Sequence, residues 1–183
     1  PGATPVFRIR CSEKIDSRKK MPIKPADKQS TAQLDAIDRA LLRELQTDGR
    51  ISNVELAQRV HLSASACLRR VKQLEDAGVI ARYVALVDPR AVGQPGTSYT
   101  IVNLERLTTP AIEAFERAVR DVPAILDCFY VAGTNDYLIR FTYHDAADLE
   151  RFHTEVLMRL PGVLRSNSML VLRTVKKTTA LEV

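Results

Sequence analysis

Basic side chains able to bind nucleic acid lie on one side of a short segment, residues 64–77. At about 100° per residue of an α-helix, Ser65, Arg69 and Lys72 point the same way as Ala66, Gln73 and Asp76, with Arg70 at the margin. Small residues at the start of such a helix allow close approach to the major groove. Arginine can donate two hydrogen bonds to guanine, and lysine can neutralise a phosphate. The pattern favours a recognition helix, and a solvated helix face is the alternative.

The opposite side of the same segment is apolar. It carries Ala64, Cys67, Leu68, Val71 and Leu74, which we expect to face a core. Ser63 is a candidate N-cap, and Gly78 can take the left-handed conformation that ends a helix. Cys67 is then expected to be a small buried hydrophobic residue rather than a redox group.

Two further helices must position this segment. Apolar residues recur at helical spacing from Leu34 to Leu45, and Asp48-Gly49 ends that stretch. Ser52 and Glu55 have the spacing of a capping box for a second, short helix, and His61-Leu62 makes the turn to the third. Two short helices joined by so tight a turn predict a helix-turn-helix. Residues 79–87 predict a β-strand, either a wing or a dimerisation strand.

A second candidate site is a carboxylate in a turn. Residues 133–136, Gly-Thr-Asn-Asp, separate two apolar stretches and predict a hairpin turn. Asp136 beside Gly133 could hold an ammonium group, although an aspartate in a turn is often only a turn former.

The elements around this turn follow the order β-α-β-β-α-β. Strands are predicted at 98–104, 125–132, 137–143 and 164–175. Helices are expected after Thr109-Pro110 and after the N-cap Asp145. This order is the ferredoxin-like pattern, an antiparallel sheet with two helices on one face. The other sheet face then carries aromatic and apolar residues, and a dimer would cover it.

Composition excludes several classes of protein. The chain has 183 residues, with 45% hydrophobic residues, 27 Lys and Arg, and 22 Asp and Glu, and no apolar run long enough to span a membrane. Cys11, Cys67 and Cys128 show no pairing pattern for a disulfide framework or a zinc site. His144 and His153 lack a neighbouring nucleophile or metal-ligand spacing, so we expect ordinary surface residues and no catalytic residue or metal.

Breaker residues and charge divide the chain into five parts. Residues 1–33 predict a disordered basic tail, a solvated arm or one that touches DNA. Residues 1–20 are expected to be non-native because Met21 is a plausible initiator. We expect an α+β protein with a winged helix-turn-helix domain at 34–87, a linker at 88–97, a ferredoxin-like domain at 98–176 and a C-terminal tail at 177–183.

The sequence resembles the Lrp/AsnC family of feast/famine transcription regulators. The resemblance is carried by residues 34–57, by residues 62–75, by residues 133–137 and 160–163, and by the C-terminal Thr-Thr-Ala-Leu of residues 178–181. It covers about residues 34–183. One position departs from the pattern, because family members commonly have an acidic residue directly after the hairpin glycine, where this chain has Thr134.

The resemblance implies a DNA-binding domain followed by an effector and oligomerisation (RAM) domain. It implies a cytoplasmic regulator that binds double-stranded DNA without a cofactor, is tuned by an amino acid, and forms dimers that assemble into tetramers or octamers. The residues expected at DNA are Arg50, Ser52, Asn53, Ser63, Ser65, Ala66, Arg69, Arg70, Lys72 and Gln73, and those expected at the effector are Gly133, Thr134, Asn135, Asp136 and Tyr137.

Three alternatives stay open at the level of sequence. A constitutive architectural DNA-binding protein would use the same basic helix without an effector. A small enzyme would use the ferredoxin-like half for chemistry, but no nucleophile and base are visible there. A metabolite-sensing scaffold would bind protein through its helices, and the basic face argues against it.

Overall fold

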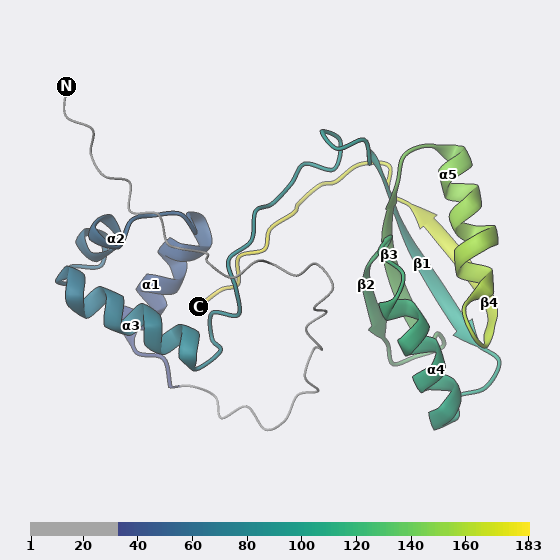
Figure 1. The fold of residues 1–183 in the computed structure, drawn as a ribbon, viewed down its shortest axis with the longest axis horizontal. Helices are drawn as coiled ribbons and strands as arrows, with labels where there is room; N and C mark the ends of the chain where they lie inside the picture. The colour runs from purple at the N-terminus through teal and green to yellow at the C-terminus, as the bar shows by residue number, and fades with distance from the viewer. Residues whose placement is uncertain (1–32) are drawn as a thin grey trace. The chain divides into compact units, whose positions relative to one another are not determined.

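The computed structural model describes residues 33–183, so the expectations for residues 1–32 lie outside the described part of the chain. The described chain forms two compact units. The helical unit runs to Val84 and also includes Thr178–Val183, and the sheet unit is Ala85–Lys177. Each unit has its own hydrophobic core. Figure 1 shows the helices α1 to α3 in the first unit and the four strands in the second.

The helical unit contains the three predicted helices, α1 (Ala36–Thr47), α2 (Asn53–Arg59) and α3 (Ala64–Asp76). Asp35 caps α1 through a reciprocal capping box with Asp38, which the sequence analysis did not identify. Leu41, Leu42, Leu56, Cys67 and Leu74 are buried together in its core. His61 takes a positive φ of 55° in the turn between α2 and α3, so the tight turn predicted there is confirmed.

The sheet unit has the predicted β-α-β-β-α-β order. Its strands are β1 (Gly96–Leu104), β2 (Ile125–Tyr130), β3 (Tyr137–Tyr143) and β4 (Val163–Leu170), arranged as β2-β3-β1-β4. All three strand pairs are antiparallel. The ferredoxin-like fold class is therefore confirmed.

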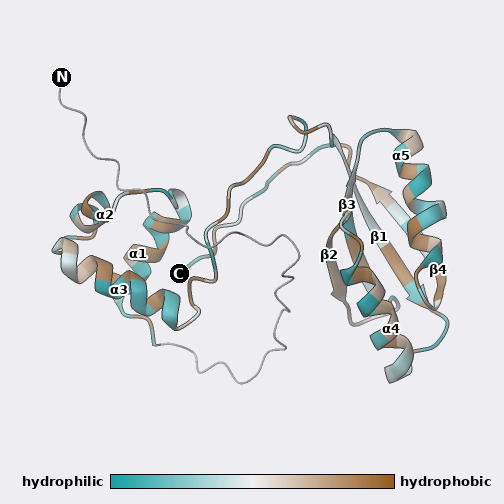
Figure 2. Ribbon diagram, viewed as in Figure 1, coloured by the Kyte–Doolittle hydropathy of each residue, from teal (hydrophilic) through white to brown (hydrophobic). Residues whose placement is uncertain are grey.

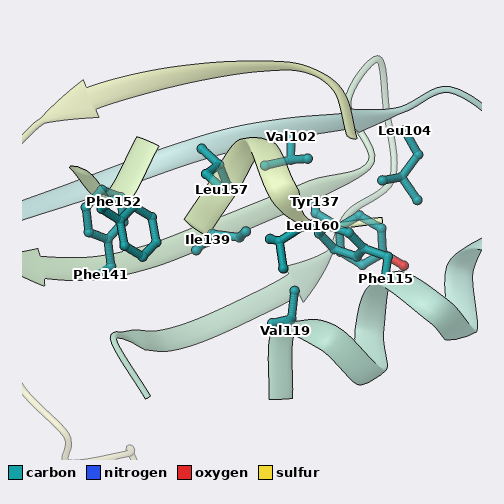
Figure 3. Packing of buried hydrophobic residues seen from close by; sticks show 10 residues of the cluster. All are labelled: Val102, Leu104, Phe115, Val119, Tyr137, Ile139, Phe141, Phe152, Leu157 and Leu160. Atoms are coloured by element: carbon teal, nitrogen blue, oxygen red, sulfur yellow. The ribbon is translucent and has the colours of Figure 1, made fainter. Parts of the chain in front are cut away.

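Helices cover one face of this sheet. α4 (Thr109–Arg120) carries Phe115 and Val119 into the core, and α5 (Ala146–Arg151) continues as a π-helical turn, Phe152–Val156, and a 3₁₀ turn, Leu157–Arg159. Figure 3 shows Phe141 stacked on Phe152 and Tyr137 beside Phe115, with ring centroids 3.8 and 4.5 Å apart. Residues of β1 and β3 thus form one continuous core with both helices.

The other sheet face bears no helix of the described chain. Alternation along the strands and the pairing register place Tyr99, Ile101, Phe129, Leu138 and Met169 on this open face. Phe129 and Met169 are about half exposed, at 53% and 46%. The Asp127–Arg140 ion pair lies among them. The same register places four polar residues on this face as well, Asn103, Thr142, Arg165 and Asn167. The open face is therefore part apolar and part polar, and the aromatic and apolar face that the sequence predicted is only half of it.

Three expectations about elements are wrong in detail. Residues 79–87 form no strand, because Val79 and Ile80 donate to the Leu74 carbonyl at the end of α3 and no strand of the described chain pairs with the residues that follow. In Figure 2 this connecting stretch is brown over much of its length. β4 ends at Leu170 rather than at residue 175. Finally, the expected tail of residues 177–183 is divided, because Thr178–Val183 belong to the helical unit and Lys177 belongs to the sheet unit.

Candidate DNA-binding face and effector turn

The first candidate site is the exposed side of α3. Ser63 caps the helix, and its Oγ accepts a hydrogen bond from the Ala66 N–H at 3.3 Å. Cys67 and Leu74 anchor the opposite side because both are buried in the helical core. The cap and these two anchors fix which residues of α3 face outward.

The outward side of α3 carries the small and basic residues that the sequence placed there. Ser65, Arg69, Lys72 and Gln73 are exposed, and Ala66 is half-buried. Among residues 33–183 Arg69 has no ion-pair partner. Leu68 is a correction, because it is 60% exposed rather than in the core. It lies about 100° from Cys67 around the helix and so falls on the flank of the exposed side.

Arg70 is engaged within the helical unit. Its Nη1 lies 2.8 Å from both the Asp35 carboxylate and the Asp38 carboxylate. The backbone N–H of Asp38 and then Arg70 lower the pKa of Asp35, while the two carboxylates raise the pKa of Arg70. This corrects the expectation of a phosphate contact by Arg70. At the margin of α3 its side chain reaches back to the start of α1.

Asn53 also has a partner inside the unit. Its Nδ2 donates to the Ala64 carbonyl at 2.8 Å, which joins the start of α2 to the start of α3. Ser52 accepts from the Glu55 N–H at 3.2 Å, whereas the Glu55 carboxylate pairs with Arg59. Only one half of the predicted capping box is therefore formed. The Ser52 hydroxyl can still donate its hydrogen to a phosphate, and Arg50 before it is exposed.

The second candidate site is the turn between β2 and β3. Gly133 has a φ of +134°, which favours glycine at this position. The Asp136 carboxylate accepts from the Leu104 N–H at 2.8 Å, just beyond the last β1–β3 pair. Thr134 and Asn135 complete the turn, and the Thr134 carbonyl accepts from Asn103 Nδ2 at 3.2 Å. The side chain of Asp136 is thus fixed to β1 through one oxygen.

Two residues near this turn were missed by the sequence analysis. Asn103 on β1 lies directly opposite Arg165 on β4, and the Arg165 Nε donates to the Asn103 Oδ1 at 3.2 Å. Three polar groups therefore lie in a row at the end of the sheet that holds the turn: the carboxylate of Asp136 just before β3, the amide of Asn103 on β1 and the guanidinium of Arg165 on β4. Only the pairing register brings residues 103, 136 and 165 together, so periodicity within one segment could not show it.

Tyr137 is a correction within the predicted effector set. Its side chain is buried beneath α4, and its hydroxyl donates to Glu116 at 3.2 Å. Burial, followed by the nearby Glu116, raises the pKa of Tyr137. Figure 3 shows the ring packed among core residues. Tyr137 therefore supports the turn from below, and its phenol does not face a ligand at the surface.

The two histidines expected at the surface differ from each other. His144 is exposed and pairs with Asp145 at 3.0 Å. His153 is half-buried, and its Nε2 lies 3.0 Å from Ser168 Oγ, which in turn lies 2.7 Å from Thr100 Oγ1. Burial lowers the pKa of His153. The expectation of a surface residue is correct for His144 only.

Two other kinds of feature are absent from residues 33–183. No cluster of three or more His, Cys, Asp or Glu side chains there could hold a metal ion. No helix in that range is both long and apolar enough to cross a membrane. Cys67 is buried and free, as expected.

Two family models match the chain, one for each part of the fold. Residues 34–81 match a winged helix-turn-helix DNA-binding domain. Residues 97–181 match the Lrp/AsnC ligand-binding domain. The matches cover α1 to α3 and, except for Gly96 at the start of β1, the four-stranded sheet, including the turn with Gly133.

Similar proteins include leucine-responsive regulatory proteins from two bacteria. The Rhizobium meliloti protein is 39% identical over 151 residues, which are 82% of this chain and 97% of that protein. The Escherichia coli K12 protein is 40% identical over 148 residues, covering 81% of this chain and 90% of that protein.

Two solved structures are also similar. A transcriptional regulator from Neisseria meningitidis in complex with L-Met is 40% identical, with a TM-score of 0.78 over 81% of this chain and 96% of that one. An AsnC family regulator from Agrobacterium tumefaciens is 30% identical, with a TM-score of 0.77 over the same shares. With both domain models and relatives at this identity across the fold, the chain belongs to the Lrp/AsnC family of helix-turn-helix transcriptional regulators with an amino-acid-binding domain.

Proposed function

We propose that the protein binds specific double-stranded DNA through α3 and that an amino acid bound at the Gly133–Asp136 turn tunes this binding. The observation that carries the DNA-binding part is the exposed Ser65, Arg69 and Lys72 side of a helix whose other side is buried. The start of α3 enters the major groove, where Ser65 and Ala66 leave room for base edges.

Each exposed residue has a distinct task at DNA. Arg69 donates to guanine O6 and N7, and Gln73 reaches a neighbouring base. Lys72 and Arg50 neutralise phosphates, while Ser52 and Ser63 donate hydroxyl hydrogens to them. Asn53 and Arg70 act indirectly, because their bonds to Ala64 and to Asp35 and Asp38 hold the helices in place.

The effector site takes a zwitterion. An α-amino acid carries one ammonium and one carboxylate, and the row of Asp136, Asn103 and Arg165 offers the complementary charges in the same order. Asp136 holds the ammonium group and Arg165 holds the carboxylate. The L-Met complex of the Neisseria meningitidis relative supports an amino acid of this kind. Thr134 adds a hydroxyl where family members commonly have an acid.

The chain works as a homo-oligomer without a cofactor and without a catalytic role of its own. The open face of the sheet, with Phe129 and Met169 half exposed, supports a dimer in which two such faces pack together. Dimers assemble further into tetramers or octamers in the cytoplasm, which place several α3 helices along one DNA molecule.

The experiment that tests this function compares Arg69→Ala with Arg39→Ala, which removes the same charge from the exposed side of α1. Binding is measured on the upstream DNA of the protein's own gene and on random DNA, across salt concentrations and with pooled amino acids. Loss of about 1 to 3 kcal/mol on the upstream fragment for Arg69→Ala alone supports base contact. An equal loss of binding free energy on both DNAs would show that Arg69 contacts only phosphates. Absence of DNA binding by the unaltered chain would overturn the proposal.

A further inference from the structure

The C-terminal segment, residues 178–183, returns to the helical unit and contacts α1. The Gln46 side-chain amide makes two hydrogen bonds to the backbone of Leu181. Its Oε1 accepts from the Leu181 N–H at 2.7 Å, and its Nε2 donates to the Leu181 carbonyl at 3.1 Å. Arg43, one turn earlier, donates from Nη1 to a backbone oxygen of Val183 at 2.9 Å. Three hydrogen bonds thus hold a segment that forms no helix or strand of its own.

The apolar part of the contact is made by Val183. Its side chain is half-buried and packs against the helical core, whereas Leu181 is 75% exposed. Because both hydrogen bonds of the Gln46 amide go to the backbone of Leu181, Gln46 recognises an extended backbone and not a particular side chain. The surface therefore binds the side chain of residue 183 and the backbone of residue 181.

We propose that the α1 surface formed by Arg43 and Gln46 is a docking site for an extended peptide and that its occupant is the chain's own segment 178–183. The sheet unit is then tied to the helical unit at both of its ends, through residues 84–85 and through residues 177–178. α1 carries the docked segment at Arg43 and Gln46, and Asp35 and Asp38 at its beginning bind Arg70 of α3. Docking holds α1 and, through Arg70, the helix that contacts DNA. This last step rests on the proposed function.

Hydrogen exchange on the full chain tests the docking. Gln46→Glu removes the Nε2 donor and sets a carboxylate against the Leu181 carbonyl. Val183→Asp places a charge in the apolar contact. Both should speed amide exchange about tenfold in α1 and at Leu181, and leave strands β1 to β4 unchanged. Gln58→Glu on the exposed side of α2 is the matched control and should change neither.

Unchanged protection of Leu181 and α1 in both variants would overturn the docking site. Loss of protection at Leu181 and α1 when the unaltered chain is diluted would show that the segment comes from a second copy of the chain, which contradicts an occupant from the same chain. Because exchange needs neither DNA nor effector, this result is independent of the proposed function.

DNA binding tests the step to α3. Gln46→Glu should weaken binding to the upstream fragment several-fold more than Gln58→Glu, although Gln58 lies on a helix of the helix-turn-helix itself. Faster α1 exchange with equal DNA affinity would overturn transmission to α3. If the unaltered chain binds no DNA, the proposed function and this step both fail, and exchange alone still decides the docking.

Discussion

Arg69 and Arg70 are adjacent arginines on α3 with different roles in the structure. Arg69 points outward, whereas Arg70 is held by two carboxylates of α1. Both side chains carry the same charge and lie about 100° apart around the helix, and only the position of α1 separates their roles. For this reason the sequence analysis could propose an outward basic face, but it could not tell that one of its members is part of the fold.

We expect Arg70→Ala to reduce the stability of the helical unit, because Asp35 and Asp38 would then face each other without a cation. Arg69→Ala should leave stability unchanged. Thermal unfolding followed by circular dichroism measures the difference. Equal melting temperatures for the two variants would show that the α1–α3 ion pairs do not stabilise the unit. The Asp38→Asn variant should share the loss seen for Arg70→Ala.

The Cys128 thiol should react slowly with alkylating reagents. Burial, followed by the nearby Glu116, raises its pKa to about 11 from 9.0. The fraction of reactive thiolate at pH 8 is then about 100-fold lower than for an ordinary thiol. The pKa of the Cys128 thiol is higher in the folded chain than in the unfolded chain. The neutral thiol therefore contributes its full stabilisation below pH 9, and this contribution is lost as the pH rises through about 11. Alkylation of the Cys128 peptide, followed by mass spectrometry, should accelerate tenfold per pH unit from 8 to 10. A plateau near pH 9 would contradict the raised pKa.

At the scale of elements, hydrophobic periodicity predicted all three helices of the helical unit and all four strands of the sheet. Periodicity failed where the structure of a segment depends on contacts with another segment. Residues 79–87 have the composition of a strand but no strand beside them in the described chain. The helix after Asp145 changes to π and 3₁₀ turns, which no local pattern indicated. Likewise, Asn103 and Arg165 meet Asp136 only through the register of three strands.

Gly96 begins β1 opposite Tyr143 of β3, and a Cβ there would overlap the Tyr143 ring. We expect Gly96→Ala to destabilise the sheet unit by about 1 to 3 kcal/mol, because the ring must leave its packing position beside Phe141. Urea denaturation measures this loss. The double variant Gly96→Ala with Tyr143→Ala should recover part of it, and an undiminished loss would assign the effect to the backbone instead.

The proposed amino-acid site has a charged side chain at each end, Asp136 for the ammonium group and Arg165 for the carboxylate. Arg165→Ala should weaken binding of an α-amino acid at least tenfold, because a charge-assisted bond to the carboxylate is lost. Calorimetry with L-Met, the ligand of the Neisseria meningitidis relative, checks this loss. Binding of the amine analogue that lacks the carboxylate should not depend on Arg165. Equal weakening of both ligands would show that Arg165 only supports the turn.

At the scale of the whole molecule, the open face predicts association. Phe129→Glu places a charge among Leu138 and its neighbours and should shift the assembly towards smaller species without unfolding the sheet. Sedimentation velocity measures the species present. Val92→Glu makes the same change of charge at an apolar position that lies outside the sheet and is 61% exposed, and it serves as the control. An unaltered distribution for Phe129→Glu would place the subunit contact elsewhere.

The return of residues 178–183 to α1 also affects how the protein is made. On the ribosome, the three helices emerge before the sheet unit, and the segment that docks on them is translated more than 90 residues after Val84. About 130 residues separate the end of α1 from Thr178, so at about 5 to 20 residues per second the α1 surface stays uncovered for roughly 7 to 26 s. The DNA-reading unit therefore becomes complete only after the ligand-sensing unit has been synthesised, so a nascent chain acquires both activities together.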